Sequence, residues 1–425
     1  MLDINLFREN PAIVKENLKK RGMDSLIPEI DKVIPLDKKW RESLQKEDSL
    51  RKERNETSIS ISKEKDASKK KALVAKAKKL SDQITVLEPK TRELQNKRDF
   101  AIYAFPNILH SSVPVGASDE ENEVIKEWGK KPNFSFKPKG HEELLELHGM
   151  ADFERAAKIS GARFYFLKNA GVLLDNALQQ FALGFLSKEG FSIIRTPELL
   201  TKKAISTAIS FADFEDVIYK IEGEDLYLIG TAEHPLTAMH SDEIINSKDL
   251  PLKYAGLSSC FRKEAGAHGK DTKGLYRVHE FRKVEQYIIC HPEESWKFFD
   301  YLVSLNEKMF QALKIPYRLV NVCTGDIGMI AAKKIDLEAW LPPRNAFGEM
   351  TSCSNCTDFQ ARRAKLRFFD KDSKTEMLHT INSTAVATPR TIVALLENHQ
   401  KKDGSISIPK ALQPYLNNLK ELVPK

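Results

Sequence analysis

Residues 260–286 read CFRKEAGAHGKDTKGLYRVHEFRKVEQ. This stretch indicates the fold class of the chain. Its first segment follows a strand period of two, which puts Arg262 and Glu264 on one face and Phe261 on the other. A second strand-like segment follows after a polar connection. Two strands joined by a loop, with a cation and a carboxylate on one face, indicate a half-buried sheet.

The second segment, HEFRKVEQYIIC, places Phe281, Lys283 and Glu285 on one face of a strand. Phe281 and Glu285 lie roughly 13 Å apart at about 3.3 Å per residue, which suits an elongated ligand with an adenine at one end and an amine at the other. The competing interpretation is a surface ion-pair ladder on a solvated sheet face, which a single strand favours roughly two to one. Spacing alone therefore does not establish a site.

The flanking segments predict an α+β domain. FSIIRTP (191–197), DLYLIG (225–230) and PYRLVNVC (316–323) read as further strands, and residues 174–190 read as an amphipathic helix. Several strands follow one another without an intervening helix, so we expect a mostly antiparallel sheet flanked by helices. We assign this domain to residues 106–425.

Residues 31–103 have the composition of a long helical arm, with no glycine and with dense Lys, Arg and Glu. The apolar seam of the second limb is Leu73, Ala77, Leu80, Ile84, Leu87 and Leu94, and that of the first limb is Val33, Leu36, Trp40 and Leu50. Ser43 and Glu47 weaken the register of the first limb, and Pro89 predicts a kink or an interruption in the second. We expect an antiparallel hairpin (coiled coil) that turns near residues 62–71, within an N-terminal domain of residues 1–105.

Five lysines gather where this hairpin turns: Lys63, Lys65, Lys69, Lys70 and Lys71. Such a cluster is most often a solvated charged face. Its place at the end of a thin projecting element favours contact with phosphates of a nucleic acid.

The bulk properties set further limits. The chain has 425 residues, 41% of them hydrophobic, and a net charge of +7, which permits a polyanionic partner without requiring one.

Five cysteines without framework spacing favour a reducing compartment, the cytoplasm, and the single pair Cys353 and Cys356 argues against structural zinc. No apolar run reaches the roughly 18 residues of a membrane helix, so we expect no membrane association. Without a phosphate-binding glycine loop, an ATP user of this kind must hold phosphates with arginines and metal.

Taken together, these motifs resemble the seryl-tRNA synthetases, a class II aminoacyl-tRNA synthetase family, over essentially the whole chain. The matching segments are the arm at 31–103, the first class motif at 190–197, TAEH at 231–234, the second class motif at 260–286, FGEMTSCSNCTDFQARR at 347–363, and the third class motif within 382–400. The resemblance implies a tRNA-binding hairpin followed by a catalytic class II domain.

The resemblance also implies an ATP site. In it, Arg262 binds the α-phosphate together with the serine carboxylate, Glu264 accepts a hydrogen bond from the adenine amine, and Phe281 and Arg390 enclose the adenine ring. The ATP set implied is Arg262, Glu264, Arg277, Val278, Phe281, Arg390 and, as Mg²⁺ ligands, Glu349 and Ser352.

The serine site implied consists of Thr231, Glu233, Arg262, Glu285, Asn382 and Thr384. Glu285 meets the ammonium group, and Asn382 and Thr384 lie near the hydroxyl. A buried site built to hydrogen-bond a hydroxyl rejects alanine by a factor on the order of 10⁴. Threonine must be rejected by volume, because no editing domain is visible.

The implied reaction forms seryl-adenylate and pyrophosphate from L-serine and ATP, then transfers serine to the 3′ end of tRNA(Ser). The tRNA would be held by its long variable arm and its acceptor end, and the family often also charges tRNA(Sec). The first class motif implies a homodimer with a two-fold interface.

Three alternatives stay open. An inactive RNA-binding paralogue would be marked by loss of Arg262, Glu264, Glu285, Glu349 or Arg390, all of which are present. A ligase that charges a carrier protein would not need the arm. A class II enzyme for threonine or alanine fits the TAEH and SCSNCTDFQARR segments less well.

Overall fold

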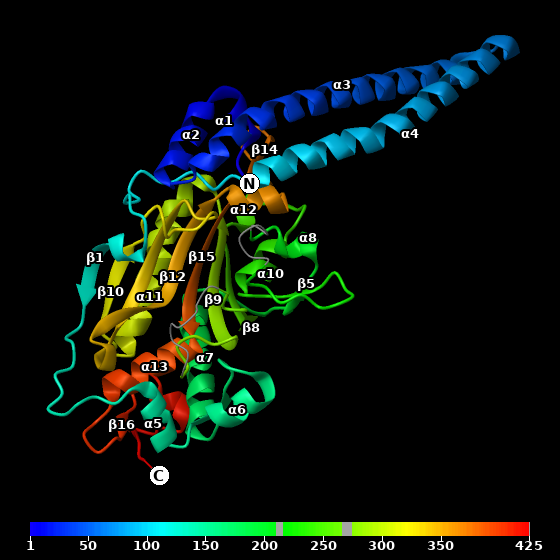
Figure 1. Ribbon diagram of the computed structural model, residues 1–425. Coiled ribbons are helices and arrows are strands. Elements are labelled where there is room, and N and C mark those ends of the chain that lie inside the picture. Colours follow the sequence, from blue (N-terminus) through cyan, green and yellow to red (C-terminus); the bar gives the residue numbers. More distant parts are fainter. Residues whose placement is uncertain (210–215, 266–273, 425) are drawn as a thin grey trace. The chain divides into compact units, whose positions relative to one another are not determined.

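Two long helices, α3 (Ile27–Lys63) and α4 (Ala67–Tyr103), form an antiparallel hairpin (Figure 1). This computed structural model describes residues 1–209, 216–265 and 274–424. The hairpin belongs to the first of two compact units, Met1–Pro106 and Asn107–Lys425. Two short helices, α1 (Ile4–Glu9) and α2 (Pro11–Lys20), complete the first unit.

The turn of the hairpin lies at residues 64–66, inside the predicted segment. Asp66 starts α4, because its carboxylate accepts from the backbone N–H groups of Ser68 (2.8 Å) and Lys69 (3.0 Å). Leu80 and Ile84 are buried where the two helices pack, as their heptad positions require. The long-hairpin prediction is therefore confirmed.

Pro89 and two polar residues of the hairpin, Ser43 and Glu47, were predicted to disturb it. The helix α4 runs through Pro89 without interruption. Ser43 does not weaken the pairing, because its hydroxyl lies 2.8 Å from that of Thr91 on the opposite helix. Glu47 is buried and accepts from Arg51 Nε at 3.0 Å. Ser43 and Thr91 thus pair across the seam, whereas Glu47 is paired within its own helix.

The second unit is built on an eight-stranded sheet, in the order β1-β10-β11-β12-β15-β9-β8-β4. Every neighbouring pair is antiparallel except β4 and β8. The strands are β1 (Glu123–Trp128), β4 (Ser192–Arg195), β8 (Leu252–Phe261), β9 (Glu280–Cys290), β10 (Tyr317–Asn321), β11 (Lys333–Leu341), β12 (Ala346–Thr357) and β15 (His379–Ala387). The α+β prediction is confirmed.

Helices pack against this sheet and at its margins. They are α5 (His141–Leu147), α6 (Phe153–Ser160), α7 (Ala170–Lys188), α8 (Lys202–Ile205), α10 (Glu233–Ala238), α11 (Ser295–Ala312), α12 (Phe359–Ala364) and α13 (Thr388–His399). Short strands lie outside the main sheet: β2 (Ala151–Asp152), β3 (Phe166–Leu167), β5 (Leu199–Leu200), β6 (Tyr227–Leu228), β7 (Ile244–Ile245), β13 (Arg367–Phe369), β14 (Thr375–Met377), β16 (Ile406–Ser407) and β17 (Glu421–Leu422). Within the described ranges, no helix has both the length and the apolar character needed to cross a bilayer.

The alternation of β9 explains where a site can form. Val284 and Ile288 belong to the main core, which α7, α11 and α13 supply with residues such as Leu302. Tyr287 and Ile289 belong to a second cluster with residues of α10 and α12. Because successive side chains point to opposite faces, Phe281, Lys283 and Glu285 lie on the same face as this second cluster. That face is the one left for a ligand.

A buried polar junction ties α11 to the three central strands. Asn306 of α11 accepts from Gln286 Nε2 (2.7 Å) and donates to Thr351 Oγ1 (3.0 Å) and Ser383 Oγ (2.8 Å). Its side chain is almost completely inaccessible to solvent. Each of the strands β9, β12 and β15 contributes one of these partners.

Replacing Asn306 by alanine is expected to lower the free energy of unfolding by about 3 kcal/mol, because three buried groups would lose their partner at once. The melting temperature should fall by about 4 °C. Differential scanning calorimetry measures the change. Lys308→Ala, on the exposed side of the same helix, is the control and should change stability by less than about 0.5 kcal/mol. A wild-type melting temperature in Asn306→Ala would contradict this account of the junction.

Candidate active site

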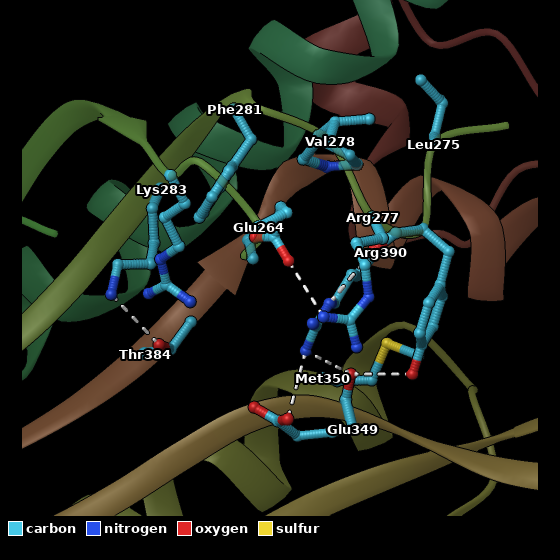
Figure 2. A pocket seen from close by; sticks show the side chains of 14 residues that line it. Glu264, Leu275, Arg277, Val278, Phe281, Lys283, Glu349, Met350, Thr384 and Arg390 are labelled. Atoms are coloured by element: carbon cyan, nitrogen blue, oxygen red, sulfur yellow. Dashed lines mark hydrogen bonds and ion pairs between the residues drawn. The ribbon is translucent and has the colours of Figure 1, made fainter. Parts of the chain in front are cut away.

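A cavity opens beside the first half of β9, on the face identified above (Figure 2). Its empty volume, including the part that is open to solvent, is about 490 Å³. Its walls are Arg262, Glu264, Leu275, Tyr276, Arg277, Val278, Phe281, Lys283, Glu349, Met350, Thr384, Ala387, Pro389 and Arg390. Segments that are far apart in the sequence, on β9, β12, β15 and α13, thus meet around one space.

Arg262 and Glu264 lie beyond the end of their strand. The sequence pattern predicted that the strand continues through both residues, and this was wrong, because β8 ends at Phe261. Glu264 has a φ of +51°, in the left-handed region, so the chain turns there. Both side chains still line the cavity, at the start of the loop that connects β8 to β9. Residues 266–273 of this loop lie outside the described ranges.

His279 holds the backbone at Arg262. Arg262 N–H donates to the carbonyl of His279 (2.9 Å), and His279 Nδ1 lies 2.8 Å from the carbonyl of Arg262. From the sequence, His279 was interpreted as an ordinary polar or packing residue and was not among the predicted site residues. The only feature of the sequence that could have indicated a role for His279 is its position in the second class motif, near the end of the loop that begins at Arg262.

At one end of the cavity, charged groups are paired with one another. Arg277 Nη1 lies 2.9 Å from Glu264 Oε2. The guanidinium of Arg390 lies 5.1 Å from the ring centre of Tyr276, and that of Arg262 lies 5.4 Å from the ring centre of Phe281. Aromatic rings and guanidinium planes therefore line this end, which can accept a flat heteroaromatic ring.

A group of oxygen donors lies on β11 and β12. Arg390 Nη1 lies 3.3 Å from Glu349 Oε2, and although burial opposes ionisation, this cation and Lys334 lower the pKa of Glu349. Asp336 stands opposite Ser352 in the register of the two strands. Burial, reinforced by the charge of Glu349, raises the pKa of Asp336 to about 7.

These donors suit a hard divalent cation. The Oδ1 atom of Asp336 is buried and has no hydrogen-bond partner among the described residues. Carboxylate and hydroxyl oxygens are the ligands that Mg²⁺ takes in proteins, typically one or two carboxylates beside substrate phosphates. Across the described ranges, no group of three or more His, Cys, Asp or Glu side chains is placed to hold a metal by itself. Glu349 and Ser352 therefore fit an Mg²⁺ ion that is also bound to phosphates, and Asp336 is a neighbour that the sequence analysis missed.

At the other end of the cavity, Lys283 and Glu285 form a buried ion pair. Only 5% of Lys283 and 2% of Glu285 is exposed, so the surface-ladder interpretation of this strand is wrong. Thr384 of β15 joins the pair. Lys283 Nζ donates to Thr384 Oγ1 at 3.4 Å (Figure 2), and that hydroxyl donates to Glu285 Oε2 at 3.4 Å. The three side chains form a closed triangle.

Glu233 of α10 lies behind this triangle. Its Oε1 atom accepts from Gln360 Nε2 (2.7 Å) and Asn382 Nδ2 (3.0 Å), and its backbone N–H donates to Thr231 Oγ1 (3.2 Å). Burial, with a further contribution from Glu285, raises the pKa of Glu233 to about 7. Gln360 was not among the predicted site residues, although it lies in the FQARR segment.

The residues predicted for ATP and serine thus fall into two layers. The cavity wall holds Arg262, Glu264, Arg277, Val278, Phe281, Glu349, Thr384 and Arg390. Thr231, Glu233, Glu285, Asn382 and Ser352 are not part of that wall. The first four of these form a polar layer that reaches the cavity through Lys283 and Thr384.

The remaining candidates lie elsewhere. Cys353 and Cys356 are buried free thiols whose pKa values are raised by burial. Lys63, Lys65, Lys69, Lys70 and Lys71 are all exposed around the turn of the hairpin. Lys69 to Lys71 occupy the first turns of α4, where the positive end of the helix dipole adds to their charge.

Two family models match this chain. The seryl-tRNA synthetase N-terminal domain matches residues 1–109, and the class II tRNA synthetase core domain (G, H, P, S and T) matches residues 216–399. A serine–tRNA ligase of Pyrococcus abyssi is 50% identical, over 100% of this chain and 98% of the relative. Crystallised seryl-tRNA synthetase of Pyrococcus horikoshii complexed with ATP is 48% identical with a TM-score of 0.88, covering 100% of both chains. The cytoplasmic serine–tRNA ligase of Naegleria fowleri in complex with AMP is 37% identical with a TM-score of 0.84, covering 100% of this chain and 99% of the other.

Proposed function

The chain belongs to the seryl-tRNA synthetase family, and we propose that it activates L-serine with ATP and transfers the seryl group to the 3′ end of tRNA(Ser). One observation carries this proposal: a single cavity joins an aromatic and arginine-lined end to a buried, charge-balanced polar end. An adenylate needs both kinds of surface within one molecule's length.

Arg262 is the residue proposed to bring the two reactants together. Its Nε donates to the carbonyl of Gly230 at 3.2 Å, which fixes the orientation of the guanidinium plane. A planar cation can bind the ATP α-phosphate and the serine carboxylate at the same time. The carboxylate then attacks the α-phosphorus, and pyrophosphate leaves. Positive charge beside the developing phosphorane lowers the barrier, and no protein nucleophile is required.

The nucleotide end has to change partners when ATP binds. Glu264 is proposed to accept from the adenine amine and Arg277 to meet the phosphates, yet the two are paired with each other here. Both groups therefore exchange an internal ion pair for contacts with the ligand. Phe281 and Arg390 are proposed to enclose the adenine ring, with Val278 against the nucleotide. Glu349 and Ser352 would hold Mg²⁺, which supplies positive charge against the phosphate oxygens when bound.

The polar end is proposed to bind serine. Glu285 offers its carboxylate to the ammonium group, and Thr231 and Glu233 line the same site. Asn382 and Thr384, both on β15, are proposed to recognise the hydroxyl. Buried groups of this kind would lose hydrogen bonds with alanine, which gives discrimination on the order of 10⁴.

The second step requires tRNA. The exposed lysines at the turn of the hairpin are proposed to contact tRNA phosphates, which orients the acceptor end for attack of its 3′-hydroxyl on the acyl carbon. We extend the proposal to tRNA(Sec) as a second acceptor, which is checked by charging both transcripts.

Two further properties complete the proposal. Apolar side chains are exposed near the edge strand β4 and the start of α7, with Ile193 51% and Leu173 57% accessible, which supports a homodimer. Five free thiols support a reducing compartment, the cytoplasm.

Serine-dependent ATP–pyrophosphate exchange without tRNA tests the activating site. The wild type is expected to exchange with serine but not with alanine, threonine or glycine. Glu285→Ala should raise KM for serine by about 10²-fold, because the ammonium loses its buried counter-charge, while KM for ATP changes little. If the folded dimer exchanges with none of the four amino acids, the chain is an RNA-binding paralogue instead.

A further inference from the structure

The amino-acid end of the site contains a charged group for which serine recognition has no direct use. The ammonium group of Lys283 lies on the cavity wall and forms an ion pair with Glu285. Glu285 is the carboxylate proposed to bind the substrate ammonium. Burying a lysine is costly unless it is paired, so its position requires an explanation. This inference rests on the proposed function and deepens it.

Two carboxylates are held close together at this end. Glu285 lies opposite Thr384 in the register of β9 and β15, and Glu233 is bound to Asn382, two residues earlier on β15. Residues two apart on a strand share a face and lie about 7 Å apart. The charge of Glu285 is, after burial, the second cause that raises the pKa of Glu233, while Lys283 lowers it.

The side chains around Glu233 show which charges can compensate. Lys283, Glu285 and Tyr287 of β9 face Glu233. Arg262, which follows β8, and Cys356 of β12 face it as well. On its own helix, His234 has a pKa lowered by burial to about 3 and is neutral. From α12, Gln360 donates to it, and Arg363 directs its guanidinium to the carbonyl of Ile209.

The formal charges in this set balance. Two cations, Lys283 and Arg262, stand against two carboxylates, Glu233 and Glu285, so the site is neutral overall. A neutral site matches serine, which is itself a zwitterion. Without Lys283 the set would carry a net negative charge in a buried place, and the pKa of Glu233 would rise further, because Lys283 is one of the charges that lower it.

We propose that Lys283 is a positioning residue whose ammonium offsets the negative charge of Glu233 and Glu285, so that both carboxylates can serve a substrate ammonium. It also sets the direction of the hydrogen bonds at Thr384. Because Lys283 donates to Thr384 Oγ1 and that hydroxyl donates to Glu285, the remaining lone pair of Thr384 can accept from the serine hydroxyl.

The test measures serine binding by isothermal titration calorimetry between pH 6 and 8.5, beside serine-dependent exchange over the same range. In the wild type, affinity should fall as the pH drops below about 7, because Glu233 becomes protonated. In Lys283→Met this loss should begin about one pH unit higher. Serine affinity at pH 7 should then be about 5-fold weaker and should recover at pH 8.5, with KM for ATP unchanged.

Three further variants separate positioning from a purely structural role. Lys283→Arg keeps the charge and should keep the wild-type profile. Glu233→Gln should remove the acidic limb of the profile, and adding Lys283→Met should not restore it. The matched control is Lys126→Met, which breaks the ion pair of Lys126 with Glu307 (2.7 Å) away from the cavity and should leave the profile unchanged.

Two results would overturn the inference: a Lys283→Met profile parallel to that of the wild type, or weak binding that no pH restores in a protein with the wild-type melting temperature. The experiment also distinguishes failure of the proposed function from failure of the inference about Lys283. Wild-type protein that binds serine with the expected profile but exchanges no pyrophosphate refutes the proposed function alone. Exchange whose pH profile is unaffected by Lys283→Met refutes this inference alone.

Discussion

Arg262→Ala is expected to lower kcat/KM for serine-dependent pyrophosphate exchange by about 10³- to 10⁴-fold, the largest effect of any single substitution considered. Two anions, the α-phosphate and the serine carboxylate, are proposed to share this one guanidinium. Each charge-assisted contact contributes about 2 kcal/mol. Without it, the two reactants repel each other at the point of attack, and the developing charge has no partner on this side.

Steady-state exchange at saturating and limiting serine measures the loss, and a second variant identifies its origin. Arg262→Lys keeps the charge but loses the fork that binds two anions, so we expect an intermediate loss of about 10²-fold. Arg318→Ala, which breaks the contact of Arg318 with Glu338 outside the cavity, should retain wild-type exchange. If Arg262→Ala retained a tenth of the wild-type activity, Arg262 would not be the residue that joins the reactants.

The catalytic strand could be predicted because its pattern is local. Phe281, Lys283 and Glu285 are separated by single residues, Arg282 and Val284, and the period of two alone places them on one face. Whether that face is exposed or buried cannot be seen in the strand itself. Elements from elsewhere in the chain, such as β15 and α10, cover this face and bury it. Because the strand alone does not reveal them, a surface ion-pair ladder was the better interpretation of the strand by itself.

Other site residues are visible only through long-range pairing. Asp336 and Ser352 face each other because β11 pairs with β12 in one particular register. Gln360 reaches Glu233 from a helix that lies more than a hundred residues away in the sequence. Neither contact has a signal in the local pattern, so sequence periodicity could not find them.

Local reasoning extended β8 too far and allowed an interruption at Pro89 that α4 does not have. The strand pattern was extended through Glu264, but the chain turns there into the left-handed region, and side-chain alternation no longer applies. At Pro89 a kink or an interruption was predicted; α4 has no interruption there, and α3 packs along it. In both places, the position of neighbouring segments outweighs the local propensity.

Removing the positive charge at the hairpin turn is expected to separate the two steps of the reaction. With Lys63, Lys65, Lys69, Lys70 and Lys71 all replaced by glutamate, kcat/KM for tRNA(Ser) in aminoacylation should fall by about 10³-fold, because lost phosphate contacts become repulsive. Serine-dependent exchange without tRNA should stay within about two-fold of the wild type, since these side chains are exposed on the hairpin and the exchange reaction needs no tRNA.

The salt dependence distinguishes phosphate contacts from a general loss of charge. The logarithm of the wild-type affinity for tRNA should fall steeply with the logarithm of the salt concentration, and each lost phosphate contact should reduce the slope by about one. A matched variant with five exposed lysines changed to glutamate in the second unit, Lys371, Lys374, Lys401, Lys402 and Lys410, controls for net charge. If both variants lost aminoacylation equally, total charge would govern tRNA binding. If only the hairpin variant lost it, with a reduced slope, the turn of α3 and α4 is where the phosphates are bound.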